Sequence, residues 1–202
     1  MHFEFLRQLR ERQDQTAVIP TIADILLAQF QEEHAVKWRQ AYGAFCSNHL
    51  DAVSIYKEQL KSDRRFQEFV QQCSNNPLLR KMGIPECILT VTTRITKYPL
   101  LIEPLIKTAK DRPAEQQKLR SCLSLVKGIL VDVNGMVAEK ERAQRLLEIY
   151  NRMDARSHVT HEGRKFKKSD ILLEGRKLLF EGLCSLVSPP IVPTNPTSRG
   201  NR

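Results

Sequence analysis

The sequence has 202 residues, 41% of them apolar, which is enough to bury the core of one domain. Eight glycines and an aromatic share of 6% argue against a β-sandwich or β-barrel and favour helices. The excess of 32 basic over 23 acidic residues gives a formal charge of +9, which suits an acidic partner such as nucleic acid, anionic lipid or an acidic protein surface.

The N-terminal part predicts three amphipathic helices. Residues 2–13 form a short helix with one apolar side, and residues 21–30 form a second, with "QEEH" as the boundary after it. Residues 35–60 predict one continuous helix, in which Trp38 is expected to fill the core. Ser62 or Asp63 can cap the helix that follows.

The middle of the chain predicts a bent helix. Residues 75–85 carry turn residues, and Pro85 suits the first turn of a helix that runs to about residue 109. Pro99 and Pro104 lie inside it, and an internal proline costs a helix roughly 3 kcal/mol, so a kink held by packing is expected. Core positions are expected at Leu100, Leu101 and Leu105.

The last third of the chain changes character near residue 154. Residues 114–153 carry one long apolar pattern, roughly 60 Å of helix, with Asp111 as a possible cap. A polar, basic linker follows, and "KLLFEGLC", residues 177–184, predicts a strand. The remainder is rich in proline, serine and threonine and predicts disorder.

Residues for covalent chemistry are not apparent in the sequence. Its isolated glycines, such as Gly163 and Gly175, do not form a phosphate-binding loop, and the pair His158 and His161 lacks further metal ligands nearby. We therefore expect no cofactor, no metal site and no binding of GTP by the chain itself. Nucleic-acid binding would depend on charge alone and is not expected either.

A resemblance to a known family comes from "TRITKYPLLI", residues 93–102. It is similar to the signature helix of the Dbl-homology domain, the catalytic domain of Rho guanine-nucleotide exchange factors, with the pattern Q-R-[IL]-T-K-Y-P-L-L-L. The chain departs from this pattern at Thr93 and Ile102. The stretches "YGAFCSNHLDAVSIYK", "RFQEFV" and "RLLEIYNRMD" also resemble the Lbc-like subfamily, so the resemblance covers about residues 20–155.

The resemblance implies an all-α, elongated helical bundle that binds a Rho-type GTPase, RhoA by subfamily, and acts without covalent chemistry. The resemblance also implies which residues bind the GTPase. Lys97 matches the signature lysine, and Asn134 occupies the place where many members have an asparagine that reaches the second switch region of the GTPase. Thr93 and Arg94 lie beside them. Arg94 is expected to brace the bundle rather than to contact the partner.

The resemblance also predicts a domain division and departures from the family. We expect a Dbl-homology domain at 1–155 that lacks the family's first, glutamate-bearing helix. A linker and the opening strand of a pleckstrin-homology domain follow at 156–184, and a disordered tail at 185–202. On this basis, exchange activity is expected to be weak or absent.

Two hypotheses about function and a location follow. The first is a Rho exchange factor, and the alternative is a non-catalytic helical module that sequesters a GTPase or another protein. The basic cluster at 162–168 offers a contact to anionic membrane lipid. Five scattered cysteines, no signal peptide and no apolar run near the roughly 18 residues of a membrane span predict a cytoplasmic protein, with association to the membrane or the cytoskeleton as the alternative.

Overall fold

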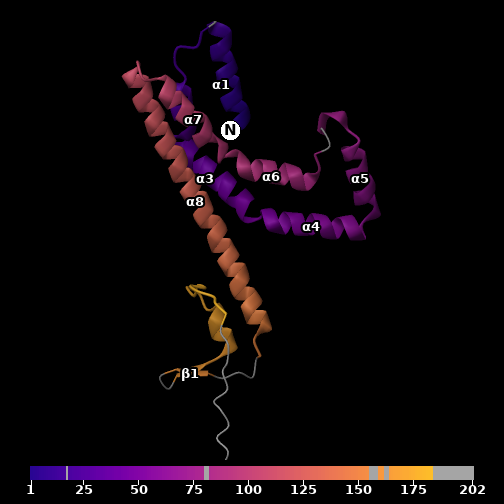
Figure 1. Cartoon of the computed structure of the whole chain (residues 1–202). Helices are drawn as coiled ribbons and strands as arrows, with labels where there is room; N and C mark the ends of the chain where they lie inside the picture. The colour runs from indigo at the N-terminus through magenta and orange to yellow at the C-terminus, as the bar shows by residue number, and fades with distance from the viewer. Residues whose placement is uncertain (17, 80–81, 155–158, 162–163, 184–202) are drawn as a thin grey trace, which may run out of the picture.

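A computed structural model of the chain describes residues 1–16, 18–79, 82–154, 159–161 and 164–183. In these ranges the chain is almost entirely helical, and the helices are arranged around one long rod, α8 (Figure 1). The α-helices are α1 (His2–Gln15), α2 (Ala23–Phe30), α3 (Glu32–Ser47), α4 (His49–Ser62), α5 (Arg64–Ser74), α6 (Ile84–Arg94), α7 (Lys97–Thr108) and α8 (Pro113–Arg152). The prediction of an elongated all-α bundle is confirmed.

The core lies along the upper part of α8, where α2, α3 and α7 pack against it. The 40 residues of α8 make a rod of roughly 60 Å, as its apolar pattern predicts. The predicted cap Asp111 is wrong, because α8 begins from Arg112 with Pro113 in its first turn and without a side-chain cap. The buried apolar side chains of the core are Ala23, Leu26, Phe30, Ala35, Trp38, Tyr42, Cys46, Ile95, Tyr98, Ile102, Ala109, Leu119, Cys122, Val126, Ile129 and Val133.

An aromatic cluster sits at the centre of this core. Trp38 is 0% exposed, and its ring centroid lies 5.3 Å from that of Phe30, 5.4 Å from Tyr42 and 5.7 Å from Tyr98. Because these rings come from α2, α3 and α7, the cluster joins the two consecutive helices α2 and α3 to α7, which is distant from them in sequence. The prediction that Trp38 fills the core is confirmed.

The start of α2 is capped from a distant helix. Glu115 on α8 is 8% exposed and accepts hydrogen bonds from the backbone N–H groups of Ile22, at 2.9 Å, and Ala23, at 3.1 Å. Burial raises the pKa of Glu115, but these bonds and one from the Thr21 hydroxyl outweigh it and hold the pKa below its usual value. The carboxylate thus satisfies amides that a helix leaves unpaired and fixes α2 to α8.

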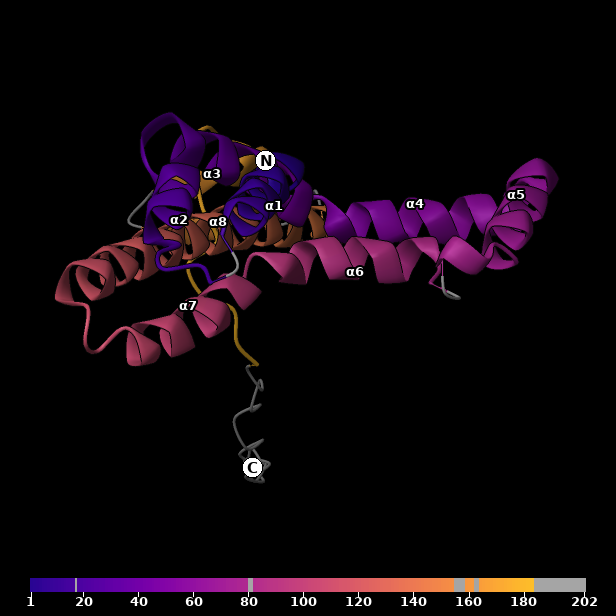
Figure 2. The ribbon, with the colours of Figure 1, turned by 90° about the horizontal axis from the view of Figure 1, so that it is seen from above.

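Helices α4, α5 and α6 form an arm that projects from the bundle (Figures 1 and 2). Figure 2 shows α4 and α6 lying side by side with α5 at the tip, and none of the three contains a fully buried residue. The predicted cap of α5 is confirmed for Asp63, whose side chain accepts from the N–H groups of Arg65 and Phe66.

The predicted continuous helix over 35–60 is wrong, since it is divided at Asn48 into α3 and α4. Two side chains satisfy backbone carbonyls at this point: Asn48 Nδ2 donates to Ala44 O at 2.8 Å and His49 Nδ1 to Cys46 O at 2.6 Å. Such local bonds offer the backbone an alternative to the helical ladder. The division turns the chain from the core into the arm.

The predicted helix through both prolines is divided just before Pro99, whereas Pro104 lies within α7. Helix α6 ends at Arg94 and α7 begins at Lys97. Pro99 has no N–H to offer Ile95 O, and its ring would clash with that carbonyl in a continuous helix. In the first turn of α7 the missing N–H costs little. The break allows α6 to follow the arm and α7 to follow α8.

One 18-residue window of α8 has a mean hydropathy of 1.4, contrary to the expectation of no apolar run of that length. By length and composition alone, this is weak evidence for a membrane span. Two charged residues within the helix pair with its neighbours: Lys127 with Glu103 on α7, and Asp132 with Arg39 on α3. The same helix supplies buried residues of the core, so we interpret it as the central helix of the bundle.

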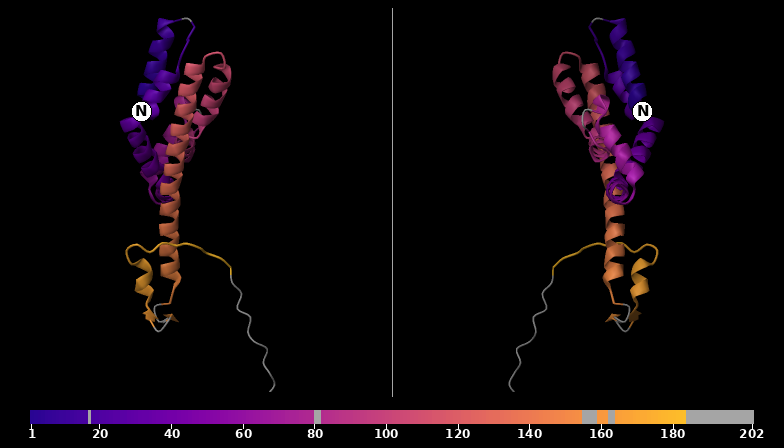
Figure 3. Two further views of the ribbon diagram at one scale, coloured as in Figure 1. Left: turned by 90° about the vertical axis from the view of Figure 1, so that its left-hand side faces the viewer. Right: turned by 90° about the vertical axis from the view of Figure 1, so that its right-hand side faces the viewer.

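After α8 the chain forms a short antiparallel hairpin, β1 (Val159–His161) and β2 (Arg164–Phe166), and the 3₁₀-helix η2 (Lys168–Leu172). The predicted strand over 177–184 is wrong for its described part, because residues 176–183 have no regular secondary structure. They follow η2 back beside α8, so backbone partners for a strand are not adjacent there (Figure 3). The predicted disordered tail at 185–202 lies outside the described residues.

Candidate protein-binding face

The break between α6 and α7 places Lys97 at the start of α7, on the surface. The neighbouring Tyr98 and Ile95 point into the core, at 6% and 1% exposure, and therefore fix the direction in which Lys97 projects. The predicted site residue is thus a surface cation on a rigidly packed turn. Thr93 is exposed too, but its hydroxyl donates to Leu89 O at 2.9 Å, within its own helix.

Arg94 connects α6 to α1, and this contact agrees with the expectation that Arg94 braces the bundle. Its Nε donates to His2 Nδ1 at 3.3 Å, and the same His2 nitrogen lies 2.9 Å from the hydroxyl of Tyr98. Since a guanidinium can only donate, Nδ1 of His2 is an acceptor. The proton is then on Nε2, which donates to the Tyr42 hydroxyl at 2.7 Å.

This network makes His2 a neutral residue. Burial, followed by the positive charge of Arg94, lowers the pKa of His2 to about 4. Burial also raises the pKa of Tyr42 to about 12. One imidazole therefore links α1 with the hydroxyls of α3 and α7 while all of these groups remain uncharged at neutral pH.

We expect acid to weaken the bundle through His2. In the unfolded chain its pKa is near 6.5, so the unfolded state binds more protons between pH 6.5 and 4 and stability falls as pH is lowered through this window. Discounted for partial exposure of the ring, the loss is on the order of 1–2 kcal/mol. Urea unfolding at pH 7.5 and pH 4.5 measures it, and His2→Gln should flatten the difference. Parallel pH dependence in both proteins would contradict this assignment.

Asn134 is exposed on α8, and Lys97 is exposed at the start of α7. Helices α7 and α8 run antiparallel through a short turn and are joined by the ion pair between Lys127 Nζ and Glu103 Oε1, at 3.2 Å, and by a bond from Gln116 Nε2 to Ile106 O, at 3.1 Å. Counted residue by residue from these two contacts, Lys97 lies opposite the stretch of α8 from Leu125 to Val133, which directly precedes Asn134. The structure therefore places these two predicted site residues near each other along the same helix pair.

Three aliphatic side chains on the same helix pair are exposed: Leu100 and Leu101 at 62% each, and Val131 at 70%. The expectation that Leu100 and Leu101 are core residues is wrong, whereas Leu105 does pack against the core. We call the surface made by Lys97, Leu100, Leu101, Val131 and Asn134 the α7–α8 face. Exposed aliphatic residues beside a cation and an amide are typical of protein-binding surfaces.

A sequence signal could have identified these leucines. The core stripe of this region is Ile95, Tyr98, Ile102, Leu105 and Ala109, spaced by three, four, three and four. Leu100 and Leu101 fall outside that stripe. The spacing of the stripe, rather than the apolar character of the motif, therefore indicates which side faces the core.

The α7–α8 face continues into a groove of about 360 Å³ between α1 and α7. Phe3 and Leu6 from α1 face Lys97 and Leu101 from α7 across it, and Phe3 is 81% exposed. Among the described residues, no group of three or more His, Cys, Asp or Glu side chains is placed to hold a metal ion. What the arrangement offers is a contact surface with apolar, cationic and amide groups.

Comparison with known proteins gives relatives of one kind. The family model of the RhoGEF domain matches residues 1–134. Human Rho guanine nucleotide exchange factor 28 is 40% identical over 191 residues, which is 91% of this chain and 11% of that protein. Mouse Rho guanine nucleotide exchange factor 2 is 41% identical over 190 residues, 90% of this chain and 19% of that protein. The chain thus spans under a fifth of the length of these relatives.

Solved structures with a similar fold belong to the same group. The PDZ-RhoGEF DH/PH domains in complex with GTP-γ-S-activated RhoA match with a TM-score of 0.72 and 29% identity, over 76% of this chain and 43% of that one. The linker-DH/PH domains of p115-RhoGEF, truncated at the N-terminus, match with a TM-score of 0.70 and 30% identity, over 76% and 45%. The similar fold confirms the predicted helical architecture.

Proposed function

This chain belongs to the RhoGEF (Dbl-homology) family, and from that premise we propose that its α7–α8 face binds a Rho-type GTPase and favours the nucleotide-free form. The observation that carries the proposal is that Lys97 and Asn134 are exposed on neighbouring stretches of two packed helices, with exposed aliphatic residues one turn away on each helix. Relatives named as Rho exchange factors, and a similar fold solved in complex with RhoA, support it.

The mechanism needs only differential binding. If the chain binds the empty GTPase more tightly than the loaded one, nucleotide affinity must fall by the same factor in the complex. The α7–α8 face would supply that difference by contacting a conformation of the GTPase that nucleotide disfavours. We propose that no bond is made or broken by the chain, which would therefore act by binding rather than as an enzyme.

RhoA is our proposed partner within the Rho family. It is the GTPase in the similar structures of the PDZ-RhoGEF DH/PH domains. The formal charge of +9 would favour encounter with an acidic surface, so association should slow as salt is raised. We also propose a cytoplasmic location.

The test is the nucleotide dependence of binding. Purified chain and RhoA are mixed in nucleotide-free, GDP-loaded and GTP-γ-S-loaded form, and each Kd is measured by calorimetry. We expect the nucleotide-free form to bind at least about tenfold more tightly, a difference of about 1.4 kcal/mol. Equal affinity for all three forms would instead support the non-catalytic, sequestering module, and no binding in any form would reject both.

Membrane lipid is a second proposed partner, through the basic cluster at 162–168. Part of this cluster is already engaged, because Lys168 Nζ donates to Met153 O at 2.8 Å and lies 4.6 Å from the centroid of the Tyr150 ring. Lys168 therefore has a structural role, and any attraction to anionic lipid would depend on the remaining basic residues of the cluster.

A further inference from the structure

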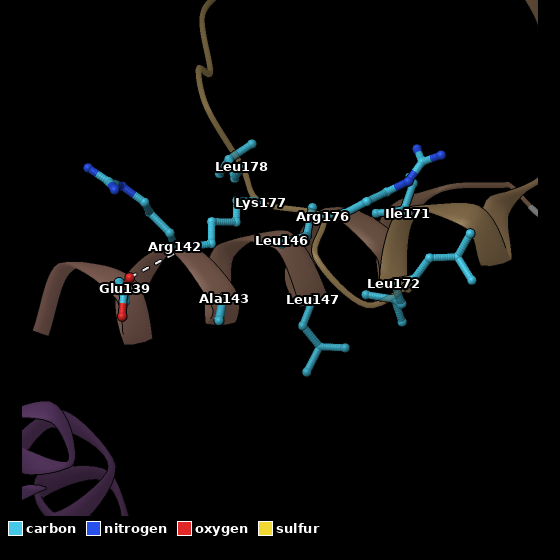
Figure 4. A pocket seen from close by; sticks show the side chains of 11 residues that line it. Glu139, Arg142, Ala143, Leu146, Leu147, Ile171, Leu172, Arg176, Lys177 and Leu178 are labelled. Carbon is cyan, nitrogen blue, oxygen red and sulfur yellow. Dashed lines mark ion pairs between the residues drawn. The ribbon is translucent and has the colours of Figure 1, made fainter. Parts of the chain in front are cut away.

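A groove of about 460 Å³ runs between the end of α8 and the segment 168–183, which we call the strap. On the α8 side it is lined by Ala143, Leu146 and Leu147, and on the strap side by Ile171, Leu172 and Leu178 (Figure 4). Leu147 and Leu172 are 49% and 44% exposed, so these aliphatic walls are open to water. Their concave, apolar character is that of a ligand site rather than of a plain helix surface.

The rim of the groove is basic. Arg142, Arg176 and Lys177 line it together with one acidic residue, Glu139. Lys177 Nζ lies 3.5 Å from Glu139 Oε1, whereas Arg142 forms no hydrogen bond or ion pair with any described residue. Figure 4 shows Arg142, Lys177 and Glu139 at one end of the groove, Arg176 with Ile171 and Leu172 toward the other end, and Leu146 and Leu147 between them. The end near Arg142 therefore attracts an anion, and the aliphatic walls beyond it can accept an apolar chain.

The strap is held in place by several contacts. Arg145 Nε on α8 donates to Glu181 Oε2 at 2.8 Å, in addition to the contacts of Lys168 with Met153 and Tyr150. A site whose walls are already joined loses less conformational freedom when a ligand binds.

We propose that this groove binds a single-chain anionic lipid, with its acidic head at Arg142 and Lys177 and its acyl chain along Leu146, Ile171 and Leu172. The volume supports one chain: at about 30 Å³ per water molecule, and with a methylene group of similar size, it holds roughly fifteen carbons. The net positive rim supplies the complementary charge. This proposal does not depend on the GTPase-binding proposal.

The chain's own tail is a poorer occupant. Residues 184–202 contain two arginines and no acidic residue, so their side chains offer no negative charge to the basic rim. A bilayer surface is flat, whereas these walls face each other across a concave slot. A monomeric lipid fits both the charge and the shape.

The test uses cis-parinaric acid, a fluorescent long-chain fatty acid, titrated into the full chain below its micellar concentration. We expect saturable binding of one molecule per chain. The double variant Arg142→Glu/Lys177→Glu should weaken binding at least about tenfold, because it replaces the attraction of the head group by repulsion. A neutral long-chain alcohol should compete much less well than an unlabelled fatty acid.

Two further variants distinguish binding in the groove from an effect of the overall charge of the chain. Ala143→Trp fills the groove from α8 and should abolish binding without changing the charge. Lys118→Glu/Arg120→Glu makes the same charge change on exposed residues of α8 outside the groove lining, and it should bind as the parent does. Circular dichroism and a thermal melt establish that each variant is folded.

Several results would overturn the proposal. They are non-saturable uptake of the probe, equal binding by the parent and the groove variants, and equal loss in the Lys118/Arg120 control. Tighter binding after removal of residues 184–202 would assign the groove to the tail. Displacement by an acidic amphipathic peptide at lower concentration than by fatty acid would assign it to a protein partner.

Discussion

Replacement of Trp38 by alanine is expected to lower the free energy of unfolding by about 3–5 kcal/mol, the range for large aromatic residues in cores. Trp38 is fully buried and lies against Phe30, Tyr42 and Tyr98, and the His2 ring meets it edge-on with centroids 4.7 Å apart. The cavity would open where α1, α2, α3 and α7 meet. Urea unfolding followed by circular dichroism measures the loss.

A matched variant separates the packing of the ring from its polar group. Trp38 Nε1 is buried and has no hydrogen-bond partner among the described residues, so this N–H contributes no compensating bond. Trp38→Phe keeps most of the apolar contacts and removes the unpaired donor, so it should cost much less than Trp38→Ala. A similar loss in both variants would show that the core needs the full indole ring and that a phenyl ring does not restore its packing.

The core was predictable from the sequence where its period was regular. The apolar pattern over 114–153 predicts both ends of α8, Pro113–Arg152, to within one residue, and Trp38 is correctly predicted to be a core residue. The two broken helices were not predicted, because their apolar period continues across the breaks at Asn48 and at Ile95 and Thr96. There, local side-chain bonds and a proline ring override the pattern.

The site was predictable in part, through the family motif. The family resemblance indicates Lys97 and Asn134 separately, but only the packing of α7 against α8 places them on neighbouring stretches of one helix pair. Leu100 and Leu101 were misassigned because an apolar run does not by itself indicate which side faces inward. The bond from Arg94 to His2 joins residues that are distant in sequence, and no local pattern predicts such a contact.

The strap was not predictable at all. Its apolar residues suggested a strand, yet the described chain turns back beside α8 and is joined to it by Arg145, Lys168 and Lys177. These contacts, two between charged side chains and one from Lys168 to the backbone carbonyl of Met153, join segments that are separate in sequence. Whether a short apolar segment becomes a strand depends on a neighbouring edge being available, and the long helix offers none.

The α7–α8 face is expected to lose RhoA binding when its cation is reversed. For Lys97→Glu we expect nucleotide-free RhoA to bind about 100-fold more weakly, a loss of about 3 kcal/mol, which is typical when a charged contact within an interface is broken. Asn134→Ala removes a neutral amide and should cost about 1–2 kcal/mol. Calorimetric Kd values, with nucleotide release measured alongside, test both.

The exposure of Lys97 makes this test specific. Its side chain is on the surface, so the substitution should change the free energy of unfolding by no more than about 0.5 kcal/mol, and a loss of binding cannot then be attributed to unfolding. Lys57→Glu, an exposed residue of α4 on the projecting arm, makes the same change in net charge and controls for electrostatic steering. If both lysine variants weaken binding equally, only the overall charge matters. If neither does, the GTPase binds elsewhere on the bundle.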